Sequence, residues 1–258
     1  MDLIEKIMLP PHIVAGFLSI ALFWLPAFTR KGGISHIRMG KLYIFFMWIV
    51  VVTAALMCLE NVWYGFYAGG SFLGFLALIT ASPLWRGIAI LRNKKAITPK
   101  YRRINLTLEL AIFLFGAALL VAGILLQSDS TAILMMVFGG LGISNAGRLW
   151  RMIRRPSQQS DWLIQHMKDM IASGIAAYTA FFAFGGRTLL GEIFTDNWMV
   201  IPWMAPTVIG ITSMRLLEKA YRRKRQSKET LPVGQIAVTA AAGKPETRRP
   251  KPQTLPIP

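Results

Sequence analysis

The sequence is poor in the residues from which soluble enzymes and metalloproteins usually build their sites. Its 258 residues include one cysteine and three histidines, and 12 acids stand against 29 Lys and Arg residues. The single Cys58 excludes an intramolecular disulfide and any site that needs several cysteines. Three histidines also exclude a cytochrome with two bis-histidine haems.

Charge is scarce as well, because only 16% of the residues are charged while 54% are hydrophobic. A soluble domain of this length rarely combines these values. The slightly acidic start "MDLIEKIMLPP" lacks the basic leader of a secretory signal, so the first apolar run is predicted to be an uncleaved span. The fold class predicted is all-α, a polytopic transmembrane helical bundle with about seven spans. The predicted spans are residues 12–29, 42–60, 71–91, 104–127, 131–149, 163–186 and 198–219.

Lys and Arg are concentrated in every second connection between these spans. The connections "RKGGISHIRMGK", "RNKKAITPKYRR" and "RLWRMIRRPSQQS" contain no acid, and the others are nearly neutral or acidic. Short loops rich in Lys and Arg stay in the cytoplasm, which predicts the N-terminus outside and the C-terminus inside. The net charge of +17 therefore indicates membrane topology and not a nucleic-acid partner.

Beyond a bundle at residues 1–220, the segment 221–258 is rich in proline and cations and poor in apolar residues. This composition predicts a disordered, basic cytoplasmic tail. The basic loops and the tail cations, starting with Arg222 to Arg225, are predicted to contact anionic lipid headgroups. A protein partner for the tail stays open.

Ionisable side chains within a span are costly, so each needs a partner or a purpose. Arg86 in the third span and Glu109 in the fourth lie at the same depth, ~9 Å below the cytoplasmic edge. An ion pair between them is expected. Asn105 lies one turn before Glu109, and Asn145 approaches from the fifth span. These four residues form a predicted intramembrane polar cluster, either a structural pin or a functional group.

The candidate cofactor-binding residues lie at the same cytoplasmic side. In "WLIQHMKDM", Asp169 follows His166 by three residues and can accept a hydrogen bond from one of its ring nitrogens, which leaves the other nitrogen for a metal or haem iron. His36 lies at the start of the second span. The alternative is an interfacial histidine without a ligand. His12 is expected on the opposite side of the membrane.

Two stretches resemble elements of a bacterial family of multi-pass membrane proteins, catalogued as a domain of unknown function. "HIRMGKLYIFF" resembles its H-R-x-x-G-R-x-Y element, and "WLIQHMKDMIASGIAAYTAFFAF" resembles its histidine, Arg-Met and small-residue element. The matching positions are His12, His36, Gly40, Tyr43, His166, Met170, Thr179 and Phe181. The chain departs from the family's arginines, since Arg38 is displaced and Lys41 and Asp169 are substitutes. The resemblance implies a bacterial inner (cytoplasmic) membrane location and no defined activity.

Three functions fit these residues. The first is a redox protein that binds one b-type haem or a quinone near the cytoplasmic face through His36 and His166. The second is a non-catalytic membrane subunit or scaffold. The third is an intramembrane metal-dependent hydrolase with His36, His166, Asp169 and Ser173 around zinc. The H-E-x-x-H spacing of known zinc hydrolases does not occur.

Overall fold

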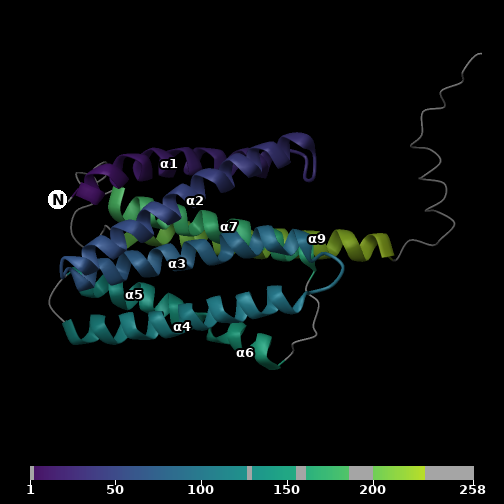
Figure 1. Ribbon diagram of the computed structural model, residues 1–258. Coiled ribbons are helices and arrows are strands. Elements are labelled where there is room, and N and C mark those ends of the chain that lie inside the picture. Colours follow the sequence, from purple (N-terminus) through teal and green to yellow (C-terminus); the bar gives the residue numbers. More distant parts are fainter. Residues whose placement is uncertain (1–2, 127–129, 155–160, 186–199, 230–258) are drawn as a thin grey trace, which may run out of the picture. The chain divides into compact units, whose positions relative to one another are not determined.

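A computed structural model describes residues 3–126, 130–154, 161–185 and 200–229. Every regular element among them is a helix (Figure 1). The elements are α1 (Leu3–Phe28), α2 (Ile34–Trp63), α3 (Tyr67–Ala89), the 3-10 turn η1 (Ile90–Arg92), α4 (Pro99–Leu126), α5 (Ser130–Ser144), α6 (Ala146–Arg154), α7 (Trp162–Ala180), the π-helical turn η2 (Phe181–Gly185) and α9 (Val200–Glu229). Contacts divide the chain into two units, Met1–Met214 and Arg215–Pro258.

Within the described ranges, five helical segments are long and apolar enough to cross a membrane, namely Lys6–Phe28, Ile34–Trp63, Tyr67–Arg92, Pro99–Leu126 and Ala132–Arg154, of which the last combines α5 and α6. Their outer surfaces carry large apolar side chains, such as Phe45 at 59% exposure and Leu125 at 77%. Water would disfavour so much exposed apolar surface, whereas lipid tails solvate it. The fold is therefore that of a multi-pass, all-helical membrane protein. Helices α7 and α9 fall where the sixth and seventh spans are expected, and residues 186–199 lie outside the described part.

Neighbours in sequence from α1 to α5 pack against one another as antiparallel helices (Figure 1). The connection between α1 and α2 turns at Gly32, whose φ of +77° is a left-handed conformation that suits glycine. There the Lys31 ammonium donates to the carbonyls of Pro26 and Ala27, at 2.8 and 2.6 Å, and so caps the end of α1. Partial burial lowers the pKa of the Lys31 amine.

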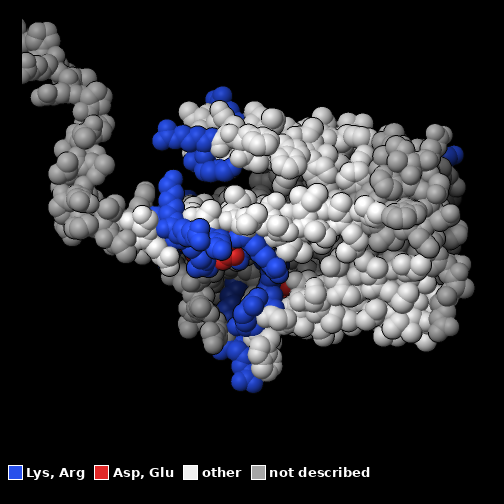
Figure 2. All heavy atoms as spheres, turned by 180° about the vertical axis from the view of Figure 1, so that it is seen from behind, with Lys and Arg blue, Asp and Glu red and all other residues white. Residues whose placement is uncertain are grey.

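The antiparallel order places the cation-rich connections at one end of the bundle. The Lys and Arg side chains of the α1–α2 and α3–α4 connections and of α6 gather at this end, and the described residues at the opposite end show almost no blue in Figure 2. We call the end with the Lys and Arg side chains the basic end. It corresponds to the side that the loop charges predict to be cytoplasmic.

Helices α4 and α5 touch backbone to backbone because glycines face each other across their contact. A Cβ added at Gly142 would lie 2.8 Å from the Cα of Gly116, and one at Gly139 would lie 2.6 Å from the nitrogen of Leu120. Small residues commonly permit such close helix packing in membranes. Next to this contact, buried aromatic and aliphatic side chains of α3, α4 and α5 form a core, which includes Phe72, Phe75, Ile112, Leu119 and Phe138.

The expected fifth span overlaps the candidate span Ala132–Arg154, whose helix is interrupted once. α5 ends at Ser144 and α6 begins at Ala146, so the break falls on Asn145. At this point the Asn145 N–H bonds to the carbonyl of Gly142, three residues back, and not four. The Asn145 side chain donates to the carbonyl of Leu141 at 3.4 Å, which competes with the helical backbone bonds.

Helix α9 crosses the predicted boundary between bundle and tail at residue 220. Helix α9 continues to Glu229, so residues 221–229 are helical. The stretch after Lys219 contains no proline before Pro232, and Glu218 pairs with Arg222 one turn later, at 2.8 Å. Both features support a helix. The remaining tail, residues 230–258, lies outside the described part.

The tight α4–α5 contact can be tested with one methyl group. Gly142→Ala should lower the free energy of unfolding by ~1–3 kcal/mol, because the added Cβ would overlap Gly116 and the ring of Phe75. Gly140→Ala is the matched control, since no atom lies within 4 Å of its added Cβ. Thermal unfolding of both variants in detergent measures the difference. Equal effects would contradict the contact.

Candidate functional site

A buried arginine organises the polar residues near the basic end. Arg86 on α3 is 6% exposed, and its Nη1 donates to Glu109 Oε1 on α4 and, at 2.8 Å, to Ser82 Oγ. Its Nε donates to Asp169 Oδ1 on α7 at 3.2 Å. Both carboxylates are fully buried. One guanidinium therefore joins three helices, because its five N–H donors point in different directions.

A second arginine closes this group from the side of the basic end. The Nη1 of Arg148 on α6 lies 3.4 Å from Glu109 Oε1 and 3.6 Å from Asp169 Oδ1. Its side chain is 35% exposed, against 7% for Arg86. Gln165 Nε2 also donates to Asp169 Oδ2, at 2.5 Å. We call Arg86, Arg148, Glu109 and Asp169 the charge network, and its two positive and two negative side chains balance.

A glycine on α3 lets α7 come close enough to reach Arg86. A Cβ added at Gly87 would collide with the side chain of Met170 and lie 3.3 Å from the Cβ of Asp169. Because Gly87 follows Arg86 directly, the close approach and the ion pair occur at the same level of the two helices. The network thus depends on a small residue beside a charged one.

The expected hydrogen bond between His166 and Asp169 is wrong. Asp169 accepts from Arg86 and Gln165, and His166 Nδ1 bonds to the backbone carbonyl of Gly87 at 2.6 Å. The spacing of three residues along a helix allows the expected bond, but the guanidinium of Arg86 is a stronger donor for a buried carboxylate. The carbonyl of Gly87 is accessible to the imidazole because Gly87 has no side chain.

His36 is oriented in the same manner, by the carbonyl of Pro26 at 3.1 Å from its Nδ1. A carbonyl oxygen can only accept, so Nδ1 carries the proton in both histidines. In the neutral ring the lone pair then lies on Nε2. His36 and His166 are close enough for their charges to interact. The basic end therefore holds two imidazoles whose Nε2 atoms are available as acceptors or ligands.

His12 and Ser173 belong to other contacts. His12 Nδ1 bonds to Thr53 Oγ1 at 2.8 Å, near the end of the bundle opposite to the basic end. Ser173 Oγ bonds to the hydroxyl of Tyr43 at 2.8 Å and donates to the carbonyl of Met170. Within the described ranges, no group of three or more His, Cys, Asp or Glu side chains could hold a metal ion. The geometry thus offers no centre for the expected metal-dependent hydrolase.

Of the two asparagines predicted in the polar cluster, only Asn105 is buried beside Glu109. The Asn145 side chain donates to the carbonyl of Leu141 and, among the described residues, makes no hydrogen bond to a side chain of the charge network. No donor among the described residues reaches Asn105 Oδ1 or Glu109 Oε2. These two acceptors lie one helical turn apart on α4, where they could receive hydrogen bonds from a donor.

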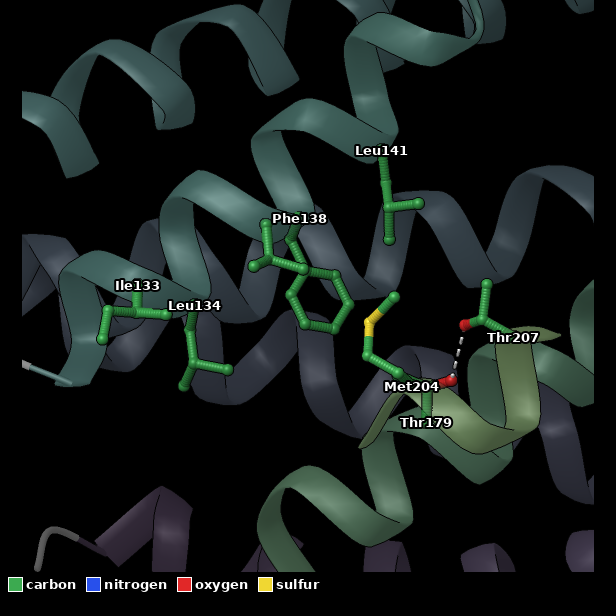
Figure 3. A pocket seen from close by; sticks show the side chains of 8 residues that line it. Ile133, Leu134, Phe138, Leu141, Thr179, Met204 and Thr207 are labelled. Carbon is green, nitrogen blue, oxygen red and sulfur yellow. Dashed lines mark hydrogen bonds between the residues drawn. The ribbon is translucent and has the colours of Figure 1, made fainter. Parts of the chain in front are cut away.

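A small cavity lies between α5, α7 and the start of α9 (Figure 3). Its volume is about 40 Å³, and its two polar lining side chains, Thr179 and Thr207, lie 3.4 Å apart and bond to each other. The remaining lining is apolar, namely Ile133, Leu134, Val137, Phe138, Leu141 and Met204. Cofactor sites have volumes of several hundred Å³, so this cavity is far too small for a haem.

Sequence reasoning missed three members of the site, which are Ser82, Arg148 and Gln165. Arg148 was assigned to a cytoplasmic loop because it stands in a run of cations. Its position three residues after Asn145 could have indicated it, since residues three apart on a helix lie on the same face. Ser82 and Gln165 lie four residues before Arg86 and Asp169, which is one helical turn.

None of the family models, curated proteins or solved structures compared with the chain matches it. The family resemblance drawn from the histidine elements therefore stays a prediction. The functional argument rests on the geometry of the chain itself.

Removing one member of the buried pair should be costly. Glu109→Gln should lower the free energy of unfolding by ~3–5 kcal/mol, because Arg86 loses its closest counter-charge. Arg86→Met combined with Glu109→Gln should recover part of this loss. Denaturant titration in detergent measures the wild type, each single variant (Glu109→Gln and Arg86→Met) and the double variant. Strictly additive losses would show that the pair does not interact.

The control for this cycle is the exposed pair of Glu218 and Arg222. Glu218→Gln removes the same kind of charge from a helix surface, and such pairs contribute only ~0.5 kcal/mol or less. A loss at Glu218 as large as that at Glu109 would mean that burial does not determine the effect.

Proposed function

We propose that the chain is a protein of the bacterial cytoplasmic membrane that crosses the bilayer seven times, with its N-terminus outside and its C-terminus inside. Support comes from the five apolar helices, from α7 and α9 at the positions of the remaining two spans, and from the cations gathered at the basic end. The resemblance of the histidine elements supports the bacterial location.

Reporter fusions test this topology. A reporter fused after Lys219 should be active as a cytoplasmic fusion, and one inserted at residues 128–130 should be active as an external fusion. The physical reason is the retention of Lys- and Arg-rich loops on the cytoplasmic side. A cytoplasmic signal from the insertion at 128–130 would contradict the seven-span topology.

We further propose that the basic end binds one redox ligand, a b-type haem or a quinone, between His36 and His166. The observation that supports it is that both imidazoles present Nε2 lone pairs, since backbone carbonyls hold both Nδ1 protons. The rings come from different helices, α2 and α7, as in helical bundles that hold haem between facing histidines. A haem would supply one-electron chemistry, while the chain orients it through these two rings.

The Nε2 atoms of the two imidazoles suit a haem, but the cavity of Figure 3 does not provide room for it. The cavity of Figure 3 is lined by α5, α7 and α9 residues, whereas His36 lies at the start of α2. A planar macrocycle between the histidines therefore requires the ends of α2 and α7 to separate. A quinone headgroup is smaller, and in its reduced quinol form its two hydroxyl groups can each donate one hydrogen bond to the Nε2 of one ring.

The second candidate is a non-catalytic membrane subunit or scaffold. The charge network supports it, because Arg86 joins three helices and Arg148 adds a fourth without any ligand. In this function the histidines orient helix ends through Gly87 and Pro26. A protein partner would then contact the basic end or the tail.

Two measurements on the detergent-purified protein distinguish the redox protein from the scaffold. An absorption spectrum detects a bound haem, and extraction with organic solvent detects a bound quinone. If a ligand is bound, His36→Ala and His166→Ala should each abolish its retention. His12→Ala is the matched control and should retain it, because His12 bonds to Thr53 near the opposite end. Asp169→Asn should have a smaller effect, since Asp169 accepts hydrogen bonds from Arg86 and Gln165 while His166 bonds to Gly87.

Loss of the ligand in His12→Ala would contradict the assigned site. If the purified protein contains neither haem nor quinone and the three alanine variants keep the properties of the wild type, the result supports the scaffold function.

A further inference from the structure

Helix α6 differs from the spanning helices in the way its side chains are distributed. It contains only nine residues, Ala146 to Arg154. At ~100° per residue, Leu149, Trp150 and Ile153 fall on one face, and its three arginines fall on the other. A short basic amphipathic helix of this kind is typical of segments that lie at a membrane surface.

The apolar face of α6 is only partly covered by the other described residues. Trp150 is 57% exposed and Ile153 is 53% exposed. The guanidinium of Arg154 lies over the ring of Trp150, 4.3 Å from its centroid, which keeps a cation beside the exposed indole. Tryptophan prefers the headgroup level of a bilayer, where an apolar body and a polar edge are both solvated.

The length of α5 places α6 at the headgroup level of the bilayer. The 15 residues of α5 extend ~22 Å at ~1.5 Å per residue, which is less than the ~30 Å of the hydrocarbon core. The break at Asn145 follows, and then Arg148 enters the charge network. The residues after Arg148 therefore lie at the edge of the hydrocarbon, at the basic end of the bundle.

The three arginines of α6 have different partners. Arg148 is neutralised by the buried carboxylates, whereas within the described ranges neither Arg151 nor Arg154 has a carboxylate partner. We infer that α6 is an interaction surface for anionic phospholipid, with Trp150 and Ile153 inserted among the lipid chains and Arg151 and Arg154 bound to headgroup phosphates. Charge complementarity selects anionic lipid over zwitterionic lipid. This inference is independent of any ligand at the histidines.

Brominated lipids, which quench tryptophan fluorescence on contact, test this surface in nanodiscs. One sample contains brominated phosphatidylglycerol in ordinary phosphatidylcholine, and the other contains the same fraction of brominated phosphatidylcholine in ordinary phosphatidylglycerol. The chain has eight tryptophans, so the Trp150 signal is the difference between the wild type and Trp150→Phe. We expect the brominated anionic lipid to quench Trp150 several-fold more strongly.

Arg151→Gln with Arg154→Gln should remove this preference, by about fivefold per arginine. The matched control is Arg222→Gln with Arg223→Gln, which removes two cations from a different helix, α9, and should leave the preference at Trp150 intact. Equal quenching by the two brominated lipids would overturn the anionic selectivity. Absence of quenching by either would overturn the lipid contact and indicate a protein cover on α6.

Discussion

The architecture of the basic end depends on one requirement, which is to solvate the guanidinium of Arg86 away from water. Burying a charge of this kind costs several kcal/mol unless other groups replace its hydration. Ser82, Glu109 and Asp169 replace it here. Because the acids come from α4 and α7, the solution fixes how both helices are rotated against α3. Arg148 then balances the second carboxylate.

Gly87 connects this network to the histidine site. Its missing side chain admits α7 to the surface of α3, and its carbonyl orients His166. One position therefore sets both the ion pair between Arg86 and Asp169 and the direction of the Nε2 lone pair. A change in the charge network would move the imidazole with it, because His166 and Asp169 lie on neighbouring turns of α7. The proposed ligand site and the contact between α3 and α7 thus share this short segment.

The depth of each polar residue along its helix could be derived from the sequence. Which of these residues pair between helices could be derived only in part. Hydropathy and loop charges predict the helical membrane fold, since lipid leaves few alternatives. The depth of Arg86 and Glu109 led to their pairing. For Asp169, spacing along the chain favoured His166, and no local pattern shows that Gly87 brings Arg86 nearer. Asn145 was expected in the cluster by depth, but its side chain bonds to its own backbone and ends α5, and Arg148 takes that place.

The most direct test of the burial of Arg86 is hydrogen exchange at arginine side chains. NMR of protein labelled with ¹⁵N at arginine Nε follows this exchange. The Nε–H of Arg86 is buried and donates to Asp169, so one arginine resonance should exchange far more slowly than the others. Arg86→Lys identifies it by its disappearance, and Asp169→Asn should shift it and accelerate its exchange. If every arginine Nε–H exchanges at the rate of a solvated side chain, Arg86 is not buried between two carboxylates.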